Sequence, residues 1–496
     1  MSSFDNALRS WVACLALLLA VPAPAADTTV AAARSPALPT ASSAGTPAAS
    51  SPAGRWSTNP AIAARIARIL AATALIDGHN DLPWELRVRF GGDLAKIDLA
   101  ADTAHLTPPP GSPPLMTDIP RLRAGLVGGQ FWSVWVPVDM HGAQAVQATI
   151  EQIDLVKAMA ARYPADFGMA YTAADVRRLH KAGRIACLIG VEGGHQINDS
   201  LAVLRQYYEL GVRYMTLTHS SNTDWADSAT DDPVHHGLTP FGREVVREMN
   251  WLGMLVDLSH VSADTMRAAL AVSVAPVIFS HSSARALVDH PRNVPDDVLR
   301  LVARNGGVVM VNFYPSYVSE ARRRWEAEHD AERARLNSPP FGGLYIGQPD
   351  RAAAAMAEWE RMHPKPAATL VDVADHIEHI RQVAGIDHVG IGSDFDGIEE
   401  APLGLEGVDR FPALLAELAR RGWSDHSLAQ LAGENVLRVL QEAQAVSARL
   451  RAQRPASSAT LQQLDHPDPA GHTVPQSSAS SSPAETSSSA SSSSTS

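Results

Sequence analysis

The chain has 496 residues, of which 45% are hydrophobic and 19% are charged, so it is long enough to bury a large core. Its formal net charge of −12 argues against nucleic acid or an anionic membrane surface as a partner, because both repel a negatively charged protein. Beyond the N-terminal stretch, no run is long and apolar enough for a membrane span.

The N-terminal stretch resembles a secretory signal. Residues 11–21, WVACLALLLAV, are apolar but too short to cross a bilayer as a helix. Arg9 precedes this run and the sequence PAPAA follows it, as in a cleavable leader. We therefore expect a signal peptide over residues 1–26 and export of the protein to the bacterial periplasm or to the outside of the cell.

Two segments have the composition of disordered chain. Residues 27–55 are rich in Ala, Ser and Pro, and residues 455–496 form a Ser-rich tail that cannot bury enough apolar surface to order itself. Of the two cysteines, Cys14 falls in the expected signal, which leaves Cys187 without an intramolecular disulfide partner. Residues 56–454 therefore form the expected folded domain, and any dimer of it would be non-covalent.

Eight apolar, strand-like runs follow one another in the expected domain. They are TALIDGH (73–79), GGQFWSVWVPV (128–138), IACLIGVEGG (185–194), VRYMTLTHS (212–220), GMLVDLSH (253–260), APVIFSH (275–281), GGVVMVNF (306–313) and HVGIGSDFDG (388–397). Helical patterns separate most of these runs, and several end in glycine, a common helix C-cap. The alternation predicts an α/β fold, a (β/α)8 TIM-like barrel rather than an open doubly wound sheet.

Two further features bear on the fold. The phosphate-binding patterns G-x-G-x-x-G and G-x-x-x-x-G-K-[ST] are both missing from the sequence, which weakens a nucleotide-binding interpretation. Residues 316–369 interrupt the strand–helix rhythm with a charged helical pattern, SEARRRWEAEHDAERARL, and a Pro/Gly-rich patch. We interpret them as an insertion between strands seven and eight that forms a lid, an oligomer contact or a passive surface elaboration.

Polar residues of the kind that bind metals stand at the end of six of the eight runs. They are His79 and Asp81, Glu192, His219, His260, His281, and Asp394 with Asp396. Each one alone could belong to an ordinary turn or helix entry. In a barrel, however, the carboxyl ends of all strands meet at one face, where active sites of this fold lie.

Imidazoles and carboxylates without thiolates suit Zn²⁺ or a similar divalent ion. The number of candidate ligands exceeds the need of one ion and fits two ions about 3.5–4 Å apart that share a carboxylate and a water or hydroxide. Such metals activate water and polarise a carbonyl, and another carboxylate can carry the proton to a leaving amine. We do not expect metal binding by His235, His236, His376, His379 and His388, and His195 is a minor candidate.

Several motifs resemble the membrane (renal) dipeptidase family, binuclear zinc dipeptidases on a barrel related to the amidohydrolases, a metallo-dependent hydrolase fold. The resemblance covers residues 74–439. It rests on LIDGHNDLPW, GVEGGHQI, MTLTHSSNTDWADS, VDLSHVS, VIFSHSSARAL, RNVPDDVL, DVADHIEHI and GIGSDFDG, which occur in the family's order. It implies hydrolysis of dipeptides with two Zn²⁺ per chain.

The resemblance also implies a role for each matching residue. His79 and Asp81 would bind the first zinc ion, His260 and His281 the second, and Glu192 would bridge them. His219 would contact the substrate carbonyl and stabilise the oxyanion instead of binding metal. Arg292 would bind the C-terminal carboxylate of the dipeptide, and Asp394 would protonate the leaving nitrogen.

The family comparison also carries expectations about substrate. Family members tolerate a D-residue at the C-terminal position, and some open the β-lactam ring of carbapenems. The mammalian relatives carry disulfides and a GPI anchor, and this sequence has neither pattern. Two alternatives remain: a two-metal hydrolase of another amide or lactone, and a catalytically silent solute-binding or scaffold protein.

Overall fold

The structure, a computed structural model, describes residues 59–106 and 112–467. The expected signal peptide (1–26) and the low-complexity segment (27–55) lie outside the described residues, as does the Ser-rich tail beyond residue 467. Within the described residues, the strands are β1 Leu75–Asn80, β2 Val127–Trp135, β3 Phe167–Met169, β4 Ile185–Glu192, β5 Val212–Thr216, β6 Leu255–Asp257, β7 Ile278–Phe279, β8 Val308–Val311 and β9 Val389–Ile391.

Eight of these strands close into a parallel barrel, as the sequence predicts. The strand order is β2-β1-β9-β8-β7-β6-β5-β4-β3, and a further pairing of β2 with β4 closes the ring. That pairing runs in continuous register from Gly129 opposite Ala186 to Trp135 opposite Glu192. The short strand β3 pairs with the first three residues of β4, Ile185 to Cys187, and takes no part in the ring. It was not expected, because three residues are too few to show a strand pattern in the sequence.

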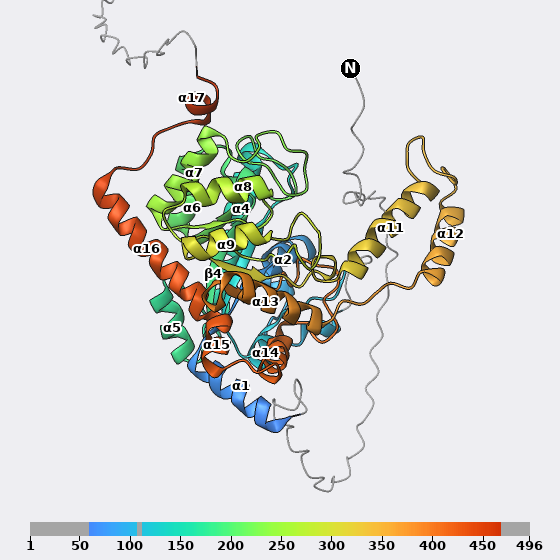
Figure 1. The fold of residues 1–496 in the computed structure, drawn as a ribbon, viewed down its shortest axis with the longest axis horizontal. Helices are drawn as coiled ribbons and strands as arrows, with labels where there is room; N and C mark the ends of the chain where they lie inside the picture. The colour runs from blue at the N-terminus through green and yellow to red at the C-terminus, as the bar shows by residue number, and fades with distance from the viewer. Residues whose placement is uncertain (1–58, 107–111, 468–496) are drawn as a thin grey trace, which may run out of the picture. The chain divides into compact units, whose positions relative to one another are not determined.

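Helices follow most strands and cover the barrel (Figure 1). They are α1 Pro60–Ala72, α2 Leu82–Phe90, α3 Ile119–Ala124, α4 Gly142–Arg162, α5 Ala173–Lys181, α6 Leu201–Leu210, α7 Pro240–Leu252, α8 Ala263–Val272, α9 Asp296–Asn305, α10 Pro315–Val318, α11 Glu320–Leu336, α12 Pro349–Met362, α13 Leu370–Ala384, α14 Phe411–Arg420, α15 Asp425–Ala429, α16 Asn435–Gln453 and α17 Leu461–Asp465. None of the helices in the described residues could span a membrane.

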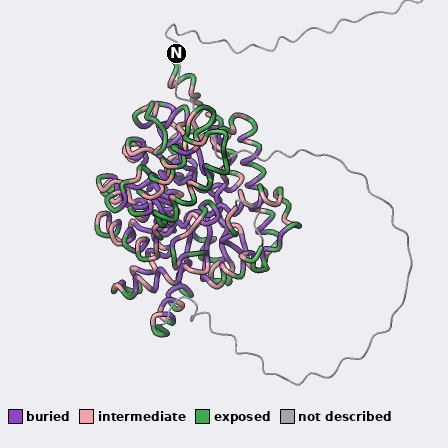
Figure 2. Tube along the Cα trace, turned by 90° about the vertical axis from the view of Figure 1, so that its right-hand side faces the viewer, coloured by how far each residue is buried: buried purple, intermediate pink, exposed green. Residues whose placement is uncertain are grey.

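The barrel interior is closely packed beneath the carboxyl ends of the strands. The ring of Tyr214 on β5 is fully buried and lies 5.1 Å from that of Phe131. Gly190 on β4 leaves the space for it, because a Cβ atom there would stand 2.0 Å from Cζ of Tyr214. Figure 2 shows that buried segments lie inside the domain and exposed segments lie at its periphery.

A buried carboxylate closes the seam between the first and last barrel strands. Strands β1 and β9 share a single ladder pair, Asp77 with Ile391. The carboxylate of Asp77 accepts hydrogen bonds from the backbone N–H and the hydroxyl of Ser393, both at 2.7 Å, and from Nε2 of Gln130 at 2.8 Å. Hydrogen bonds to a charged group contribute about 1.5–3 kcal/mol each to stability. The side-chain bonds of Asp77 therefore hold β1 to the segment after β9, where the backbone ladder has only one pair.

The expected insertion consists of a helical pair between β8 and α13. Helices α11 and α12 stand beside each other to one side of the barrel (Figure 1, yellow to orange). They pack through Trp325 and Trp359, whose ring centroids are 5.8 Å apart, and Trp325 donates to the carbonyl of His363. Phe341, between the two helices, is 94% exposed.

Part of the segment expected to be a disordered tail has a defined position. Residues 455–467 include α17, which begins with a capping box at Thr460. The carboxylate of Asp465 accepts hydrogen bonds from the hydroxyl of Thr239 and the backbone N–H of Phe241 at the start of α7. Asp465 therefore caps N–H groups at the start of α7 that have no partner within the helix. This contact fixes the position of the short segment, and its composition does not reveal it.

Candidate active site

The strand ends bring the predicted metal ligands to one rim of the barrel. His79 lies in β1, Asp81 directly follows it, and Glu192 is the last residue of β4. His260 and His281 lie in the loops that follow β6 and β7, three and two residues beyond the respective strands. Because these strands are parallel and belong to one closed barrel, donors far apart in sequence meet at the same end of it.

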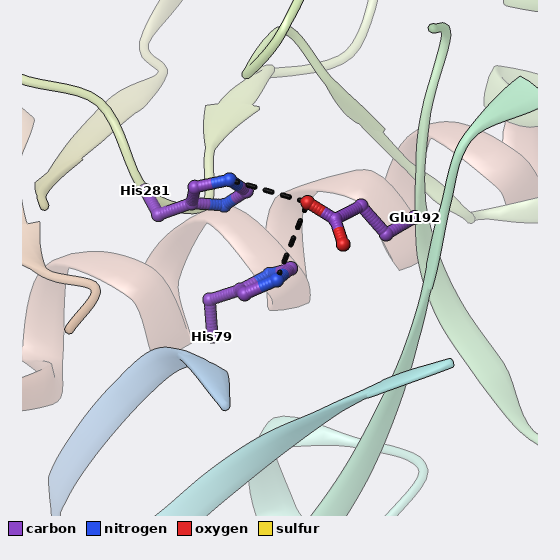
Figure 3. A group of neighbouring side chains, drawn as sticks. All are labelled: His79, Glu192 and His281. Carbon is purple, nitrogen blue, oxygen red and sulfur yellow. Dashed lines mark ion pairs between the residues drawn. The ribbon is translucent and has the colours of Figure 1, made fainter. Parts of the chain in front are cut away.

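A single carboxylate oxygen occupies the centre of this group. Oε1 of Glu192 lies 2.9 Å from Nε2 of His260, 3.3 Å from Nε2 of His281 and 3.5 Å from Nε2 of His79. Figure 3 shows His79 and His281 approaching this oxygen from two different sides. Nε2 of His219 is farther away, at 3.8 Å. Glu192 is therefore placed to be shared between two cations.

The donors form three overlapping groups. One group holds His79, Glu192 and His281, the second Glu192, His219 and His260, and the third His79, Asp81 and Asp394, with ligand atoms within 4.8 Å of one another in each. His79 belongs to two of these groups and so does Glu192, so neighbouring groups share a residue. The three groups therefore form one continuous cluster that could hold metal.

The imidazole nitrogen atoms that face the centre of the site fit metal ions. Nε2 of His79 is buried without a hydrogen-bond partner among the described residues. The Nε2 atoms of His260 and His281 are 2.9 Å apart, so both cannot carry a proton toward the other. Lone pairs that converge in a buried space with carboxylates are the donor set of a divalent cation.

Burial shapes the protonation of the site in the metal-free chain. It lowers the pKa of His219, His260 and His281 well below the usual range, and nearby positive charge such as Arg292 adds to the effect. Burial likewise raises the pKa of Glu192. Neutral imidazoles bind metals and imidazolium ions do not, so the environment of these three histidines favours their ligating form. The pKa of His79 instead is raised well above its usual range, against the effect of burial, by Tyr214 and by the carboxylates of Glu192 and Asp81.

Two side chains extend the site away from the ligands. Arg292 is 1% exposed, and its guanidinium nitrogens lie 3.4 Å from the hydroxyl of Ser282 and 3.4 Å from the carbonyl of His281. Its Cζ atom stands 5.3 Å from the ring centroid of Tyr317. Nε of this buried guanidinium has no hydrogen-bond partner among the described residues, so Arg292 could bind an external carboxylate.

Asp394 follows β9 with a positive φ of 71°. Its backbone N–H donates to the carbonyl of His79, which holds it against the first strand. Gly397 makes room nearby, because a Cβ atom there would stand 2.1 Å from Oδ2 of Asp81. Burial and the carboxylates of Asp81 and Glu192 raise the pKa of Asp394 to about 7, so it can hold or release a proton near neutral pH.

Asp396, the second aspartate after β9, belongs to none of the three ligand groups. Its carboxylate accepts a hydrogen bond from the backbone N–H of Met116.

Sequence reasoning missed two features of the site. Asn312, directly after β8, donates from Nδ2 to Oδ2 of Asp394 over 2.9 Å. Trp135, at the end of β2, lies 5.4 Å from the ring of His219 and 4.7 Å from the ring of Trp84, and the two tryptophans form an apolar wall beside the ligands. Both lie in strand-like runs whose ends carry no titratable residue, so a scan for ligand types passed over them.

Four of the histidines that were not expected to bind metal have other partners. Those in the outer layers bond to backbone or to a single carboxylate, and none belongs to a ligand group in the described residues. His195 has a pKa lowered to about 4 by burial and also belongs to no such group. The pairs are His376 with Ala284 N–H, His379 with Asp296, His235 with the Thr223 carbonyl and His388 with the Gly307 carbonyl.

Comparison with known proteins places the whole barrel in one family. The sequence model of the membrane dipeptidases (peptidase family M19) matches residues 63–454. Dipeptidase verJ of Clonostachys rogersoniana is 41% identical over 396 residues, 77% of this chain and 88% of that protein. An uncharacterized dipeptidase of Schizosaccharomyces pombe is 43% identical over 400 residues, 78% of this chain and 84% of its own length.

A solved structure shares the fold. The probable dipeptidase PvdM of Pseudomonas aeruginosa superposes with a TM-score of 0.65 at 26% identity, covering 78% of this chain and 99% of that one. The barrel, the clustered metal donors at its rim and the family match over residues 63–454 agree with one another. The chain belongs to the membrane dipeptidases, peptidase family M19, and is a metal-dependent dipeptidase.

Proposed function

We propose that this protein hydrolyses dipeptides with two zinc ions bound at the barrel rim. The observation that carries the proposal is Oε1 of Glu192, which lies within 3.5 Å of imidazole nitrogens from three different strand ends. His79 and Asp81 would hold one ion, His260 and His281 the other, and Glu192 both. When bound, the ions supply an activated water nucleophile and polarise the scissile carbonyl.

His219 has a different role in this proposal. Its Nε2 atom is the farthest of the four imidazole nitrogens from Glu192, and the ring is partly exposed on the substrate side. Because burial lowers its pKa, His219 is a neutral imidazole that can donate one N–H to the substrate carbonyl. A donor at that position stabilises the negative charge that develops on the carbonyl oxygen in the transition state.

Arg292 and Asp394 act at the two sides of the peptide bond. The planar guanidinium of Arg292 binds the C-terminal carboxylate of the dipeptide and so fixes which bond lies over the site. The raised pKa of Asp394 lets its carboxyl group receive a proton and deliver it to the departing amine. A substrate without a free carboxylate loses the first contact, and a longer peptide places its carboxylate out of reach.

Two finer proposals follow from family membership and composition. Tolerance for a D-residue at the C-terminal position fits recognition through the carboxylate more than through the side chain. The second proposal is export of the protein, directed by its N-terminal stretch. In the described residues, Cys187 is buried and unpaired, so the folded domain does not depend on a disulfide that involves it. A homodimer, if formed, would be held by non-covalent contacts.

A substrate panel tests the proposed function. The enzyme is assayed on L,L- and L,D-dipeptides, on the same dipeptides with an amidated C-terminus, and on the matching tripeptides. We expect rapid hydrolysis of both dipeptide series and weak hydrolysis of amides and tripeptides, with all activity lost on chelation. Preferential cleavage of tripeptides, or dipeptide cleavage that survives complete metal removal, would contradict the proposal.

A further inference from the structure

The three histidines proposed to bind metal differ in what holds the second nitrogen of their rings. A metal-bound imidazole normally donates the N–H of its other nitrogen to a fixed acceptor, which sets the tautomer and the ring orientation. Loss of such an acceptor weakens metal binding about 10- to 100-fold. The partners of His79, His281 and His260 therefore predict how firmly each side of the metal pair is bound.

His79 has the most rigid partner. Its Nδ1 atom lies 2.8 Å from the hydroxyl of Tyr214, and that hydroxyl donates its own proton to the carbonyl of Gly78 over 3.2 Å. With its proton committed to the carbonyl, the phenol oxygen can only accept from Nδ1–H. His79 is thereby held with its Nε2 lone pair toward Asp81 and Glu192.

The ring of Tyr214 has no room to move. It is fully buried, it packs against Phe131, and it fills the space left by the missing side chain of Gly190, two residues before Glu192 on β4. One aromatic ring thus lies under both His79 and the bridging carboxylate. The barrel core holds the acceptor in place, so no surface loop has to order when metal binds.

The partners of the other two histidines are weaker. Nδ1 of His281 lies 2.8 Å from the hydroxyl of Ser280, a short side chain whose proton can rotate. Nδ1 of His260 is buried and has no hydrogen-bond partner among the described residues, and its backbone has a positive φ of 72°. The His260–His281 side of the metal pair is therefore less firmly oriented than the His79–Asp81 side.

We infer that Tyr214 is a positioning residue that makes the ion bound by His79 and Asp81 the tighter of the two. The inference rests on the proposed two-ion function. The His79–Asp81 ion then fills first and leaves last, and the ion bound by His260 and His281 exchanges more readily with solvent metal. Removing the Tyr214 hydroxyl abolishes this difference without removing a metal ligand.

The test compares the full-length wild type with Tyr214→Phe and a matched control, Tyr163→Phe. Tyr163 also uses its hydroxyl twice, accepting from Leu99 N–H and donating to Asp98, but it lies outside the ligand groups. Each protein is dialysed against zinc buffers of graded free concentration, and bound zinc per chain is measured by atomic emission. We expect two separated binding steps for wild type and control, and a tight step weakened about 10- to 100-fold in Tyr214→Phe.

A melting experiment separates positioning from general destabilisation. Bound metal stabilises the folded protein by an amount that grows with the logarithm of its affinity, so the rise in melting temperature from metal-free to metal-loaded protein at a fixed zinc concentration reports binding. We expect a smaller increment in Tyr214→Phe, and also in Gly190→Ala, whose Cβ displaces the same ring. The control keeps the wild-type increment.

Several results would overturn the inference. They are equal zinc affinities in the wild type, an unchanged tight step in Tyr214→Phe, and a lowered metal-free melting temperature with an unchanged metal increment. Each of these leaves the dipeptidase proposal standing, because wild-type protein would still bind two ions and cleave dipeptides. Binding of fewer than two zinc ions by the wild type would instead reject the proposed function.

Discussion

The side-chain amide of Asn312 donates to Oδ2 of Asp394 over 2.9 Å and so joins the ends of β8 and β9 directly above the barrel. The oxygen of the same amide accepts the backbone N–H of Tyr314, which leaves the Asn312 side chain no freedom to rotate. This hydrogen bond uses one lone pair of Oδ2, so in the proposed function Oδ1 is the less hindered oxygen for proton exchange.

Asn312→Asp is expected to lower kcat for dipeptides about 10- to 100-fold with little change in KM. The substitution keeps the shape, removes the donor to Asp394 and adds a second carboxyl group beside it, and a lost charge-assisted hydrogen bond costs about 1.5–3 kcal/mol. Steady-state kinetics provide the measurement. Asn305→Asp is the control: Asn305 bonds to Val277 N–H and the Ala275 carbonyl before β7 begins, so kcat should stay unchanged.

Asp394→Asn removes the proposed proton carrier itself. We expect kcat to fall about 10²–10⁴-fold while zinc content stays at the wild-type level, since proton transfer by a positioned group contributes that much to rate. Kinetics and metal analysis on the same preparation check both halves. A variant that keeps more than half of the wild-type kcat would exclude Asp394 from proton transfer.

Arg292→Lys keeps a positive charge but loses the planar pair of donors. For free dipeptides KM should rise about 10- to 100-fold, because two hydrogen bonds to the carboxylate become one at best. For C-terminally amidated dipeptides KM should change little. If both substrate series weaken equally, Arg292 does not bind the carboxylate.

The ligand cluster illustrates how much of this site the sequence could predict. His79, Glu192, His260 and His281 each follow an apolar run, and parallel strands bring such positions together, so their convergence could be expected from spacing alone. The same spacing could not predict which donor stays free of metal, because His219 follows its strand in the same way as the ligands do. Its role, like that of Arg292, came only from the family resemblance.

The supporting residues were beyond reach of the sequence for a physical reason. Tyr214 looks like a core residue within a strand, and Asn312 looks like a turn residue after one. Their partners, His79 and Asp394, are more than eighty residues away along the chain. Strand β3 and the α17 contact with α7 depend likewise on distant neighbours, whereas helix ends at Gly211, Gly253 and Gly306 follow from local backbone conformation.

Asp199 and Asp224 form an acidic pair that should make stability depend on pH. Burial and the neighbouring carboxylate of Asp224 raise the pKa of Asp199 from 3.8 to about 6. Folding therefore disfavours the ionised form, and this penalty is complete above pH 6 and vanishes as the pH falls below 3.8.

Asp199→Asn should accordingly raise the melting temperature at pH 8 by about 1–2 °C and leave it unchanged at pH 3.5. The asparagine oxygen can still accept the hydrogen bond from Trp225 Nε1, so packing is preserved. Calorimetric scans from pH 3.5 to pH 8 give the comparison. Asp224→Asn should produce a smaller gain at pH 8, because it removes the charge repulsion but leaves the carboxylate of Asp199 buried. For Asp199→Asn, a gain of equal size at both pH values would argue against an electrostatic cause.

The most direct measurement of the central claim is a zinc titration of metal-free enzyme, followed by dipeptide hydrolysis. The proposed centre predicts no activity without metal, and a rise in rate that is complete when two zinc ions are bound per chain. Full dipeptide hydrolysis by protein shown to contain no metal, or activity complete at one ion per chain, would contradict it.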